Sequence, residues 1–377
     1  MRLFFVVLLC LIPHFLTGNS YQKERFGLWV VRYAVTTKAD IDKVLTTAIE
    51  LNITDIFFQV RALGHTYYNS QWEKKADNIK GDFDPLDYAI KQSGSFGIRI
   101  HAWVNMFYVW AGDRFPSDKN HIVNRRSDFI LRNGGFPDYN SLKNEGHEGF
   151  FLDPKVADVQ DDLLEILKEL AMNYDLDGIH LDYYRYPSLA YSFTPASRTL
   201  YMLENIYDPW QVYQSSQTYT EYRGYEVFLY ADRTYRNSLA GVLSGYLERI
   251  SKIVKSIQPD LKVSVAVKPD PVEAKHRYFQ DWLNWIQRDV CDFVVLMNYR
   301  TDWLEFKAVL KQLTDQNLKE KIMIGISTYN QNVEAVLKRL EAVRKGNFSG
   351  FSIFSYNYLD ENRTYFLSLR RQIFAWR

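Results

Sequence analysis

The stretch DGIHLDYYRYP, residues 177–187, decides the fold. It is a short apolar run that begins after Asp177 and ends at Asp182, and tyrosines, an arginine and a proline follow at once. A run this short and this apolar is typical of a strand buried on both faces, as in a parallel sheet. A buried strand has no use for an acid at its end, so we expect a chemical role for Asp182 and a structural role for Asp177.

Eight runs of this kind occur along the chain, and amphipathic segments separate them. The runs are 27–32, 55–61, 97–104, 177–182, 261–268, 292–299, 321–327 and 350–356. Apolar residues recur at helical spacing within 38–52, 156–174, 239–257 and 333–346. Strands that are each followed by a helix predict an α/β fold, and eight repeats predict a (β/α)8 TIM barrel. A doubly wound open sheet is the alternative, but it rarely runs to eight regular repeats.

Two connections are far longer than the few residues usual in such folds. They run from residue 105 to about 155, after the third strand, and from 183 to about 237, after the fourth. Both leave the C-terminal end of a strand, where barrel active sites form. Residues 183–230 contain 14 aromatic side chains, which indicate a small aromatic core, a wall of a sugar-binding cleft, or both.

The composition favours a carbohydrate partner over a nucleic acid. Lys and Arg number 46 against 45 Asp and Glu, and a nucleic-acid partner would require a basic excess. Aromatic residues make up 16% of the chain, with 27 tyrosines, and flat amphipathic rings suit the faces of sugars, although they also suit cores and interfaces.

The first 20 residues have the pattern of a secretory signal peptide. Arg2 precedes the apolar run 3–12, and small residues at 17–20 offer a cleavage site. An uncleaved anchor and a lipid anchor through Cys10 are the alternatives. We therefore expect a secreted or periplasmic protein without stable membrane insertion, in which 25–377 form one barrel domain. Only Cys291 then remains, so no internal disulfide is possible.

Polar and aromatic residues follow the predicted strands, and residues two apart on a strand point the same way. Asp182 is the candidate general acid, and Asp270 is the preferred second carboxylate, with Asp302 as the alternative. We expect no metal or other cofactor, because the acids are too scattered for a Ca²⁺ cage. The candidates for substrate binding are Gln59, Arg61, His101, Trp103, Asn105, His180, Tyr184, Lys268, Asn298, Tyr299, Asp302 and Tyr356.

Seven segments in order resemble the family-10-like glycosyl hydrolases, a bacterial family formerly described as a domain of unknown function. They are GLWVVR, DIFFQVRALGHTYYNSQWE, DPLDYAIKQSGSFGIRIHAWVN, FLDPKVADVQ, DGIHLDYYRYP, DFVVLMNY and GFSIFSY. The resemblance covers about residues 25–370 and implies an exported TIM-barrel glycoside hydrolase acting on a bacterial or environmental polysaccharide, in some relatives the glycan of peptidoglycan. It matches Asp182 to the family's fourth-strand aspartate, Arg61 to its second-strand arginine, and His101, Trp103 and Asn105 to its third-strand motif.

The chain departs from the family pattern in two places. Gly64-His65 stands where many members have Gly-Asp, and Lys268 and Asp270 follow the fifth strand in place of a serine-proline sequence. The first departure and the missing acid after the seventh strand favour the alternative hypothesis, which is a carbohydrate-binding barrel without turnover. A deacetylase or amidase is a third reading, for which the sequence offers neither metal triad nor nucleophile.

The stereochemical course is open from the sequence alone. Glycosidases usually use two carboxyl groups, whose separation decides between retention and inversion. An N-acetyl sugar could instead supply its own acetamide oxygen, with an acid and tyrosines to orient it.

Overall fold

The computed structural model describes residues 24–112, 114–131, 149–216, 225–313 and 315–374. Eight strands form the barrel: β1 (Arg25–Val30), β2 (Asp55–Ala62), β4 (Arg99–Asn105), β7 (Gly178–Asp182), β8 (Lys262–Val267), β9 (Phe293–Met297), β10 (Ile322–Ser327) and β11 (Gly350–Phe354). Each lies within two residues of a run predicted from the sequence. Residues 1–20, the predicted signal peptide, lie outside the described part of the chain.

The eight strands close into a parallel barrel. Neighbouring strands pair in chain order. The first strand, β1, pairs with both β2 and β11, and this pairing closes the sheet into a barrel. The short strand β3 (His65–Thr66) adds to β2 in the antiparallel sense. The predicted (β/α)8 TIM barrel is confirmed, and the open-sheet alternative is wrong.

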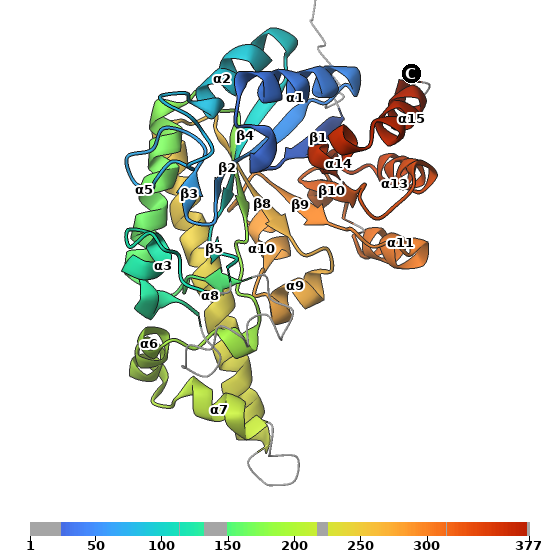
Figure 1. The fold of residues 1–377 in the computed structure, drawn as a ribbon. Helices are drawn as coiled ribbons and strands as arrows, with labels where there is room; N and C mark the ends of the chain where they lie inside the picture. Colours follow the sequence, from blue (N-terminus) through green and yellow to red (C-terminus); the bar gives the residue numbers. More distant parts are fainter. Residues whose placement is uncertain (1–23, 113, 132–148, 217–224, 314, 375–377) are drawn as a thin grey trace, which may run out of the picture.

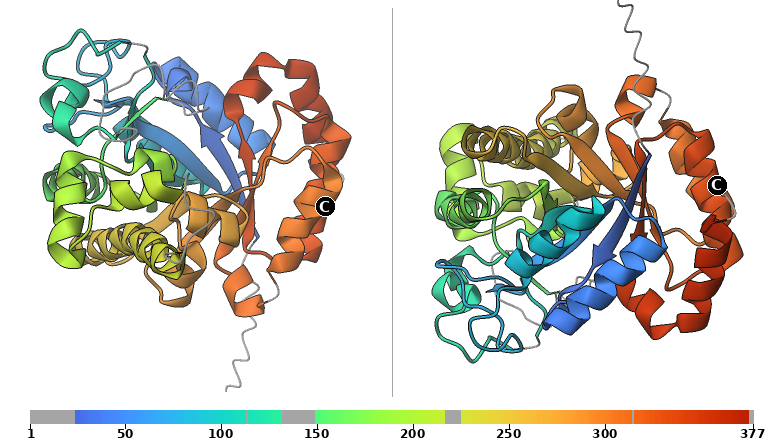
Figure 2. Two further views of the ribbon diagram at one scale, coloured as in Figure 1. Left: turned by 90° about the horizontal axis from the view of Figure 1, so that it is seen from below. Right: turned by 90° about the horizontal axis from the view of Figure 1, so that it is seen from above.

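Helices surround the barrel, as both views in Figure 2 show. The helices are α1 (Lys38–Glu50), α2 (Pro85–Ser93), α3 (Ile122–Arg125), α5 (Ala157–Asn173), α6 (Pro195–Asn205), α7 (Pro209–Ser216), α8 (Tyr225–Ile257), α9 (Pro271–Arg277), α10 (Trp282–Gln287), α11 (Trp303–Gln312), α12 (Gln316–Lys319), α13 (Val333–Lys345), α14 (Tyr356–Glu361) and α15 (Arg363–Phe374). Among the described residues, none of these helices is both long and apolar enough to cross a bilayer.

The barrel has two separate apolar layers. Large side chains from alternate strand positions fill its interior, among them Trp29, Phe57, Trp103 and Met323. A second, larger cluster lies between the outer barrel surface and the helices. The interior is so full that a Cβ on Gly178 would lie 2.2 Å from the His101 Nδ1 atom, so the barrel is a packed core and ligands are restricted to its ends.

The two long connections predicted from the sequence are present. The connection after β4 carries α3 and a two-stranded ribbon of β5 (Tyr108–Trp110) and β6 (Phe150–Phe151). The connection after β7 carries α6 and α7, which extend with α8 beyond the barrel in Figure 1. Helix α8 begins at Tyr225, about a dozen residues before the predicted end of this connection. Because β4 and β7 are neighbours, both insertions lie over one side of the barrel mouth.

Candidate active site

An aromatic floor lies at the C-terminal end of the barrel interior. We define it as Trp29, Trp103, Tyr299 and Phe354, which come from β1, β4, the end of β9 and β11. The ring centroids of Trp29 lie 6.0 Å from those of both Trp103 and Tyr299, and Tyr299 stacks on Phe354 at 5.4 Å. Four strands thus place aromatic rings at one point, where Trp29 and Trp103 are buried and Tyr299 and Phe354 are half-buried.

Asp182 is held at this floor by two hydrogen bonds. The Trp103 indole donates to Oδ2 at 3.2 Å, and the backbone N–H of Tyr183 donates to Oδ1 at 2.6 Å. The Asp182 side chain is only half-buried. These two donors orient the carboxylate at the C-terminal end of β7.

Tyr183, next to Asp182, has an unusual backbone conformation. Its φ is +50°, in the left-handed region that costs a bulky residue free energy and is found mostly at functional sites. Its ring stacks on Tyr108 with centroids 4.6 Å apart. The turn at Tyr183 changes the direction of the chain, so residues on either side of it no longer share one face.

The Tyr299 hydroxyl lies buried beside Asp182 and has no hydrogen-bond partner among the described residues. Burial raises the pKa of Tyr299 well above its ordinary value, and the charge of Asp182 raises it further. The phenol is therefore neutral and can donate a proton in a hydrogen bond. Its ring is fixed by Trp29 and Phe354.

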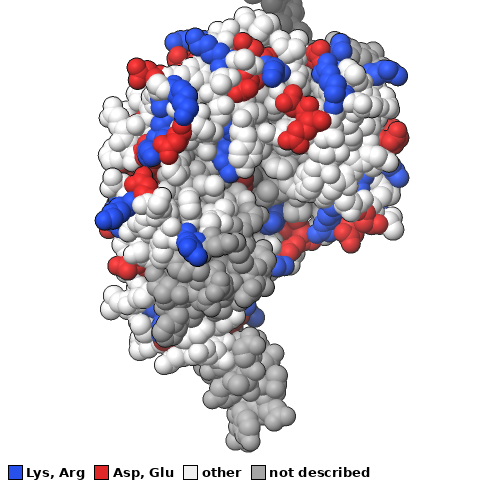
Figure 3. Space-filling view, viewed as in Figure 1, with Lys and Arg blue, Asp and Glu red and all other residues white. Residues whose placement is uncertain are grey.

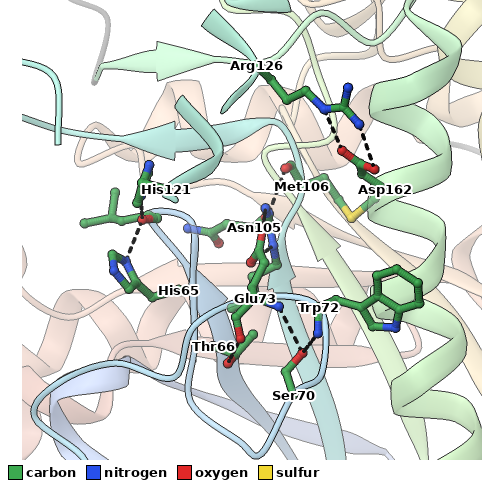
Figure 4. A network of polar contacts seen from close by, with 12 residues as sticks. His65, Thr66, Ser70, Trp72, Glu73, Asn105, Met106, His121, Arg126 and Asp162 are labelled. Atoms are coloured by element: carbon green, nitrogen blue, oxygen red, sulfur yellow. Dashed lines mark hydrogen bonds and ion pairs between the residues drawn. The ribbon is translucent and has the colours of Figure 1, made fainter. Parts of the chain in front are cut away.

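Hydrogen bonds link three of the predicted site residues where β2 pairs with β4, namely Arg61, Asn105 and Gln59. The Arg61 guanidinium is fully buried and forms a two-pronged ion pair with Glu73, at 2.6 and 2.8 Å. It also donates to the carbonyl oxygens of Asn105 and Met106, which Figure 4 shows beside Glu73. A bulge in the β2–β4 register between Gln59 and Arg61 turns Arg61 away from the mouth. Its donors serve the barrel wall, which does not support the predicted sugar contact.

Gln59 and Asn105 are nearer the mouth but are already paired. The Gln59 amide donates to the Asn105 side-chain oxygen at 3.4 Å and accepts from the backbone N–H of Arg32 at 3.1 Å. Both side chains are buried. They position the ends of three strands, and their predicted contact with substrate stays a prediction.

His65, which stands where many family members have an aspartate, has a structural role. His65 Nδ1 and His121 Nε2 both donate to the carbonyl oxygen of Leu63, at 2.9 and 2.8 Å (Figure 4). Gly64 between them has a φ of +68°, and a Cβ there would lie 2.5 Å from His121. The histidines close this turn and bring no carboxylate to it.

His101 and His180 point into the barrel but lie below the floor. His101 is bonded to Asp55, near the start of β2, at 2.9 Å, and His180 is bonded to Ser264 at 2.9 Å. Burial lowers the pKa of both imidazoles, so both are neutral. The prediction that they contact substrate is not supported by these positions, because both side chains are fully enclosed.

Three further candidates are buried outside the mouth. The Tyr184 hydroxyl donates to the Leu243 carbonyl oxygen at 2.8 Å, in the layer between barrel and helices. The Asn298 amide donates to the Phe306 carbonyl oxygen at 3.2 Å, and Tyr356 is buried at the start of α14. These positions indicate packing roles in place of the predicted substrate contacts.

The remaining candidates lie at helix starts after β8 and β9. Asp270 caps α9, where Oδ1 accepts from the N–H groups of Val272 and Glu273, and Oδ2 accepts from Gln312. Burial raises the pKa of Asp270, but these bonds outweigh it and the net pKa is lowered. Asp302 caps α11 in the same way and is exposed. Lys268 lies over the Tyr278 ring, 4.8 Å from its centroid.

The structure thus brings together Trp103, Asp182 and Tyr299 of the predicted set. It adds Trp29, Tyr183 and Phe354, which sequence reasoning missed. Strand parity could have found Trp29 and Phe354, because each lies at an inward position near the end of its predicted strand. Among the described residues, no group of three His, Cys, Asp or Glu side chains could hold a metal ion.

The charge distribution also bears on the type of ligand. On the face shown in Figure 3, cationic and anionic side chains are interspersed, and neither sign forms a broad field. A broad positive field is the usual feature of a nucleic-acid surface, and the described residues on this face do not form one.

The model of the family described as glycosyl hydrolase-like 10 matches residues 27–338. The chain belongs to the glycosyl hydrolase-like 10 family. Among its relatives, the glycosyl hydrolase DigH of Escherichia coli K12 is 22% identical over 290 residues, 71% of this chain and 59% of that protein. The glycosyl hydrolase YngK of Bacillus subtilis is 21% identical over 158 residues, 40% of this chain and 28% of that protein. This member thus spans well under two thirds of the length of these relatives.

Solved structures show the fold of the glycosyl hydrolase-like 10 chain again. The PgaB (BpsB) glycoside hydrolase domain from Bordetella bronchiseptica superposes with a TM-score of 0.66 at 12% identity, over 92% of this chain and 98% of that one. The endo-1,4-beta-mannanase from Rhizomucor miehei gives 0.53 at 10% identity, over 88% and 86%. Both neighbours are glycoside hydrolases.

Proposed function

We propose that this protein is a glycoside hydrolase that cleaves O-glycosidic bonds of a bacterial or environmental polysaccharide, with Asp182 as general acid. A peptidoglycan-type glycan of N-acetyl amino sugars is the first candidate substrate. The observation that carries the proposal is Asp182 itself, held at the end of β7 by Trp103 and Tyr183 and set against the aromatic floor. The signal-like residues 1–20 support action outside the cytoplasm.

In the proposed reaction, the floor stacks the sugar ring and Asp182 gives its proton to the glycosidic oxygen. The bond between this oxygen and the anomeric carbon breaks, and the sugar takes on oxocarbenium character. Water adds to the anomeric carbon and loses its proton to a base, which restores the charge balance. The neutral Tyr299 phenol offers a hydrogen-bond donor close to this centre.

The test is incubation of the mature chain with peptide-free peptidoglycan strands, N-acetylchito-oligosaccharides and plant β-glucans, read by mass spectrometry. We expect shorter oligomers from the wild type, and a loss of at least about a hundredfold in Asp182→Asn with binding retained. Turnover by Asp182→Asn at the wild-type rate would overturn the assignment of the acid.

Asp270 stays a prediction as the second carboxylate, and Asp270→Asn tests it cleanly. Asparagine is as good a helix cap as aspartate, so this variant keeps the start of α9 while losing the carboxylate. Unchanged turnover in Asp270→Asn would leave Asp302 or the substrate's acetamide for that role.

The second candidate function is a carbohydrate-binding barrel without turnover. It is favoured by the engagement of both Asp270 oxygens, because Oδ1 accepts the capping bonds of α9 and Oδ2 accepts from Gln312. Saturable binding of a glycan by both wild type and Asp182→Asn, with no cleavage by either, would establish it.

A further inference from the structure

A groove of about 660 Å³ opens beside the barrel mouth. The loop after β7, through Ser188–Ala190, forms one wall, and α9, with Val272, His276 and Arg277, forms the other. Tyr213 of α7 and Arg236 of α8 also line it. The groove therefore lies between the aromatic-rich connection and the helix that follows β8.

A ladder of cations and rings joins this groove to Asp182. Tyr183, next to Asp182, lies under the Arg185 guanidinium at 5.0 Å, and Arg185 lies 5.4 Å from the centroid of Tyr278. Tyr278 also lies 5.3 Å from Arg277, which lines the groove. Each step is a cation–π contact, which holds both partners in place. These contacts thus run from Tyr183, the neighbour of Asp182, to Arg277 in the wall of the groove.

Unusual backbone occurs at one end of the ladder and next to the other. Tyr183 has a φ of +50° and Phe279, which follows Tyr278, has a φ of +62°. Such conformations persist in bulky residues only where the surrounding structure holds them, and they cluster at ligand sites. They fix the positions from which the Tyr183 and Tyr278 rings are presented.

The polar groups of the groove suit sugar hydroxyls. Arg277 and Arg236 supply donors, while Asp270 and Glu273 supply acceptors, so the two signs are balanced. Arg236 is held by Asp232 at 2.7 Å, and Arg277 is held weakly by Glu273 at 3.4 Å. A lining of balanced charge that includes the Tyr213 ring matches a chain of sugars better than a polyanion.

We propose that this groove is an outer glycan subsite, which binds sugar units of the polysaccharide beyond the one held at Asp182. The inference rests on the proposed function for its substrate class. It assigns Arg277 and Tyr278 to the recognition of long chains, and it predicts that affinity rises with chain length.

The test is calorimetric binding of N-acetylchito-oligosaccharides of two and six units, and of peptide-free peptidoglycan strands, in the Asp182→Asn background. We expect the six-unit chain to bind more tightly than the two-unit chain, and Arg277→Ala or Tyr278→Ala to lower that ratio roughly tenfold. The control is Arg288→Ala, which removes an equally exposed arginine paired at 3.7 Å with Glu248. Thermal unfolding verifies that each variant is folded.

The outcomes separate this inference from the proposed function. Equal affinity for short and long chains, no binding of any of these probes, or an equal fall of the ratio in Arg288→Ala would overturn the subsite. A ratio that depends on Arg277, in a protein whose wild type cleaves nothing, would uphold the subsite and reject the hydrolase. If Tyr278→Ala unfolds, Arg277→Ala decides alone, because its side chain is 61% exposed.

Discussion

At the scale of single residues, the direction in which a side chain points and its depth in the barrel are separate properties. His101 and Trp103 point the same way from β4, yet His101 bonds to Asp55 below the floor and Trp103 bonds to Asp182 at it. Strand periodicity gives the direction of a side chain, but its height along the barrel depends on strand tilt and stagger. A candidate site taken from parity alone therefore includes side chains that no ligand can reach.

The Tyr299 hydroxyl gives the sharpest prediction at this scale. In Tyr299→Phe, we expect the free energy of unfolding to stay equal or rise, because a buried hydroxyl without a partner among the described residues is removed. We expect kcat/KM to fall roughly tenfold, the value of one hydrogen bond made in the transition state. Urea unfolding and steady-state kinetics measure the two effects.

Tyr329→Phe is the matched control, since the Tyr329 ring also contacts Phe354 but is half exposed. A Tyr299→Phe protein with wild-type kinetics, or one that is strongly destabilised, would show that the hydroxyl is structural.

At the scale of elements, the sequence placed the eight barrel strands well and the functional loops poorly. Buried parallel strands are continuous apolar runs, so the predicted runs 321–327 and 350–356 match the strands at 322–327 and 350–354 within two residues. Helix α8 begins at Tyr225, about a dozen residues earlier than expected, because the apolar periodicity that predicts a helix in the sequence is clear only from residue 239 onward. The turn at Tyr183 and the bulge before Arg61 could not be predicted, because each is a local backbone choice set by tertiary packing.

The Arg61–Glu73 pair fixes one of these loops, the connection between β2 and α2. Both side chains are buried, so Glu73→Gln leaves a buried guanidinium without its counter-charge. We expect a loss of about 3 kcal/mol in the free energy of unfolding, measured by urea denaturation. As a control, Glu341→Gln removes an exposed pair with Lys345 and should leave the unfolding midpoint unchanged. Equal effects of the two substitutions would contradict the buried role.

At the scale of the whole molecule, the base of the barrel is a buried ionic centre. Asp55 accepts hydrogen bonds from Arg25, Arg99 and His101 and is fully enclosed. Burial raises the pKa of Asp55, but its bonds to His101 and Arg99 and the charge of Arg25 outweigh it, so the net pKa lies well below the ordinary 3.8. This centre joins β1, β2 and β4 at the end opposite the proposed site.

This centre and the buried His180 in the barrel interior together predict loss of stability in acid. Burial lowers the pKa of His101 and His180 from 6.5. Below about pH 6.5 the unfolded chain therefore binds more protons than the folded protein, and the free energy of unfolding decreases as the pH is lowered. The lowered pKa of Asp55 adds a second loss below about pH 4. Unfolding free energies at about pH 7.5, 5.5 and 4 measure both steps, and His180→Gln should show a smaller first step. A flat profile between the first two values would contradict it.

The position of the two insertions has a consequence for how this protein changes over time. Both leave neighbouring strands, β4 and β7, while the half of the barrel from β9 to β11 has only short connections on the same face. Mutations that retune which glycan is accepted can therefore accumulate in two segments, with little cost to the folding of the rest. The same layout offers protein engineers a natural boundary. Exchanging the segment between β7 and α8 among homologues replaces the groove wall at Ser188–Ala190 and should change the proposed chain-length preference, while Asp182 and Arg277 stay in place.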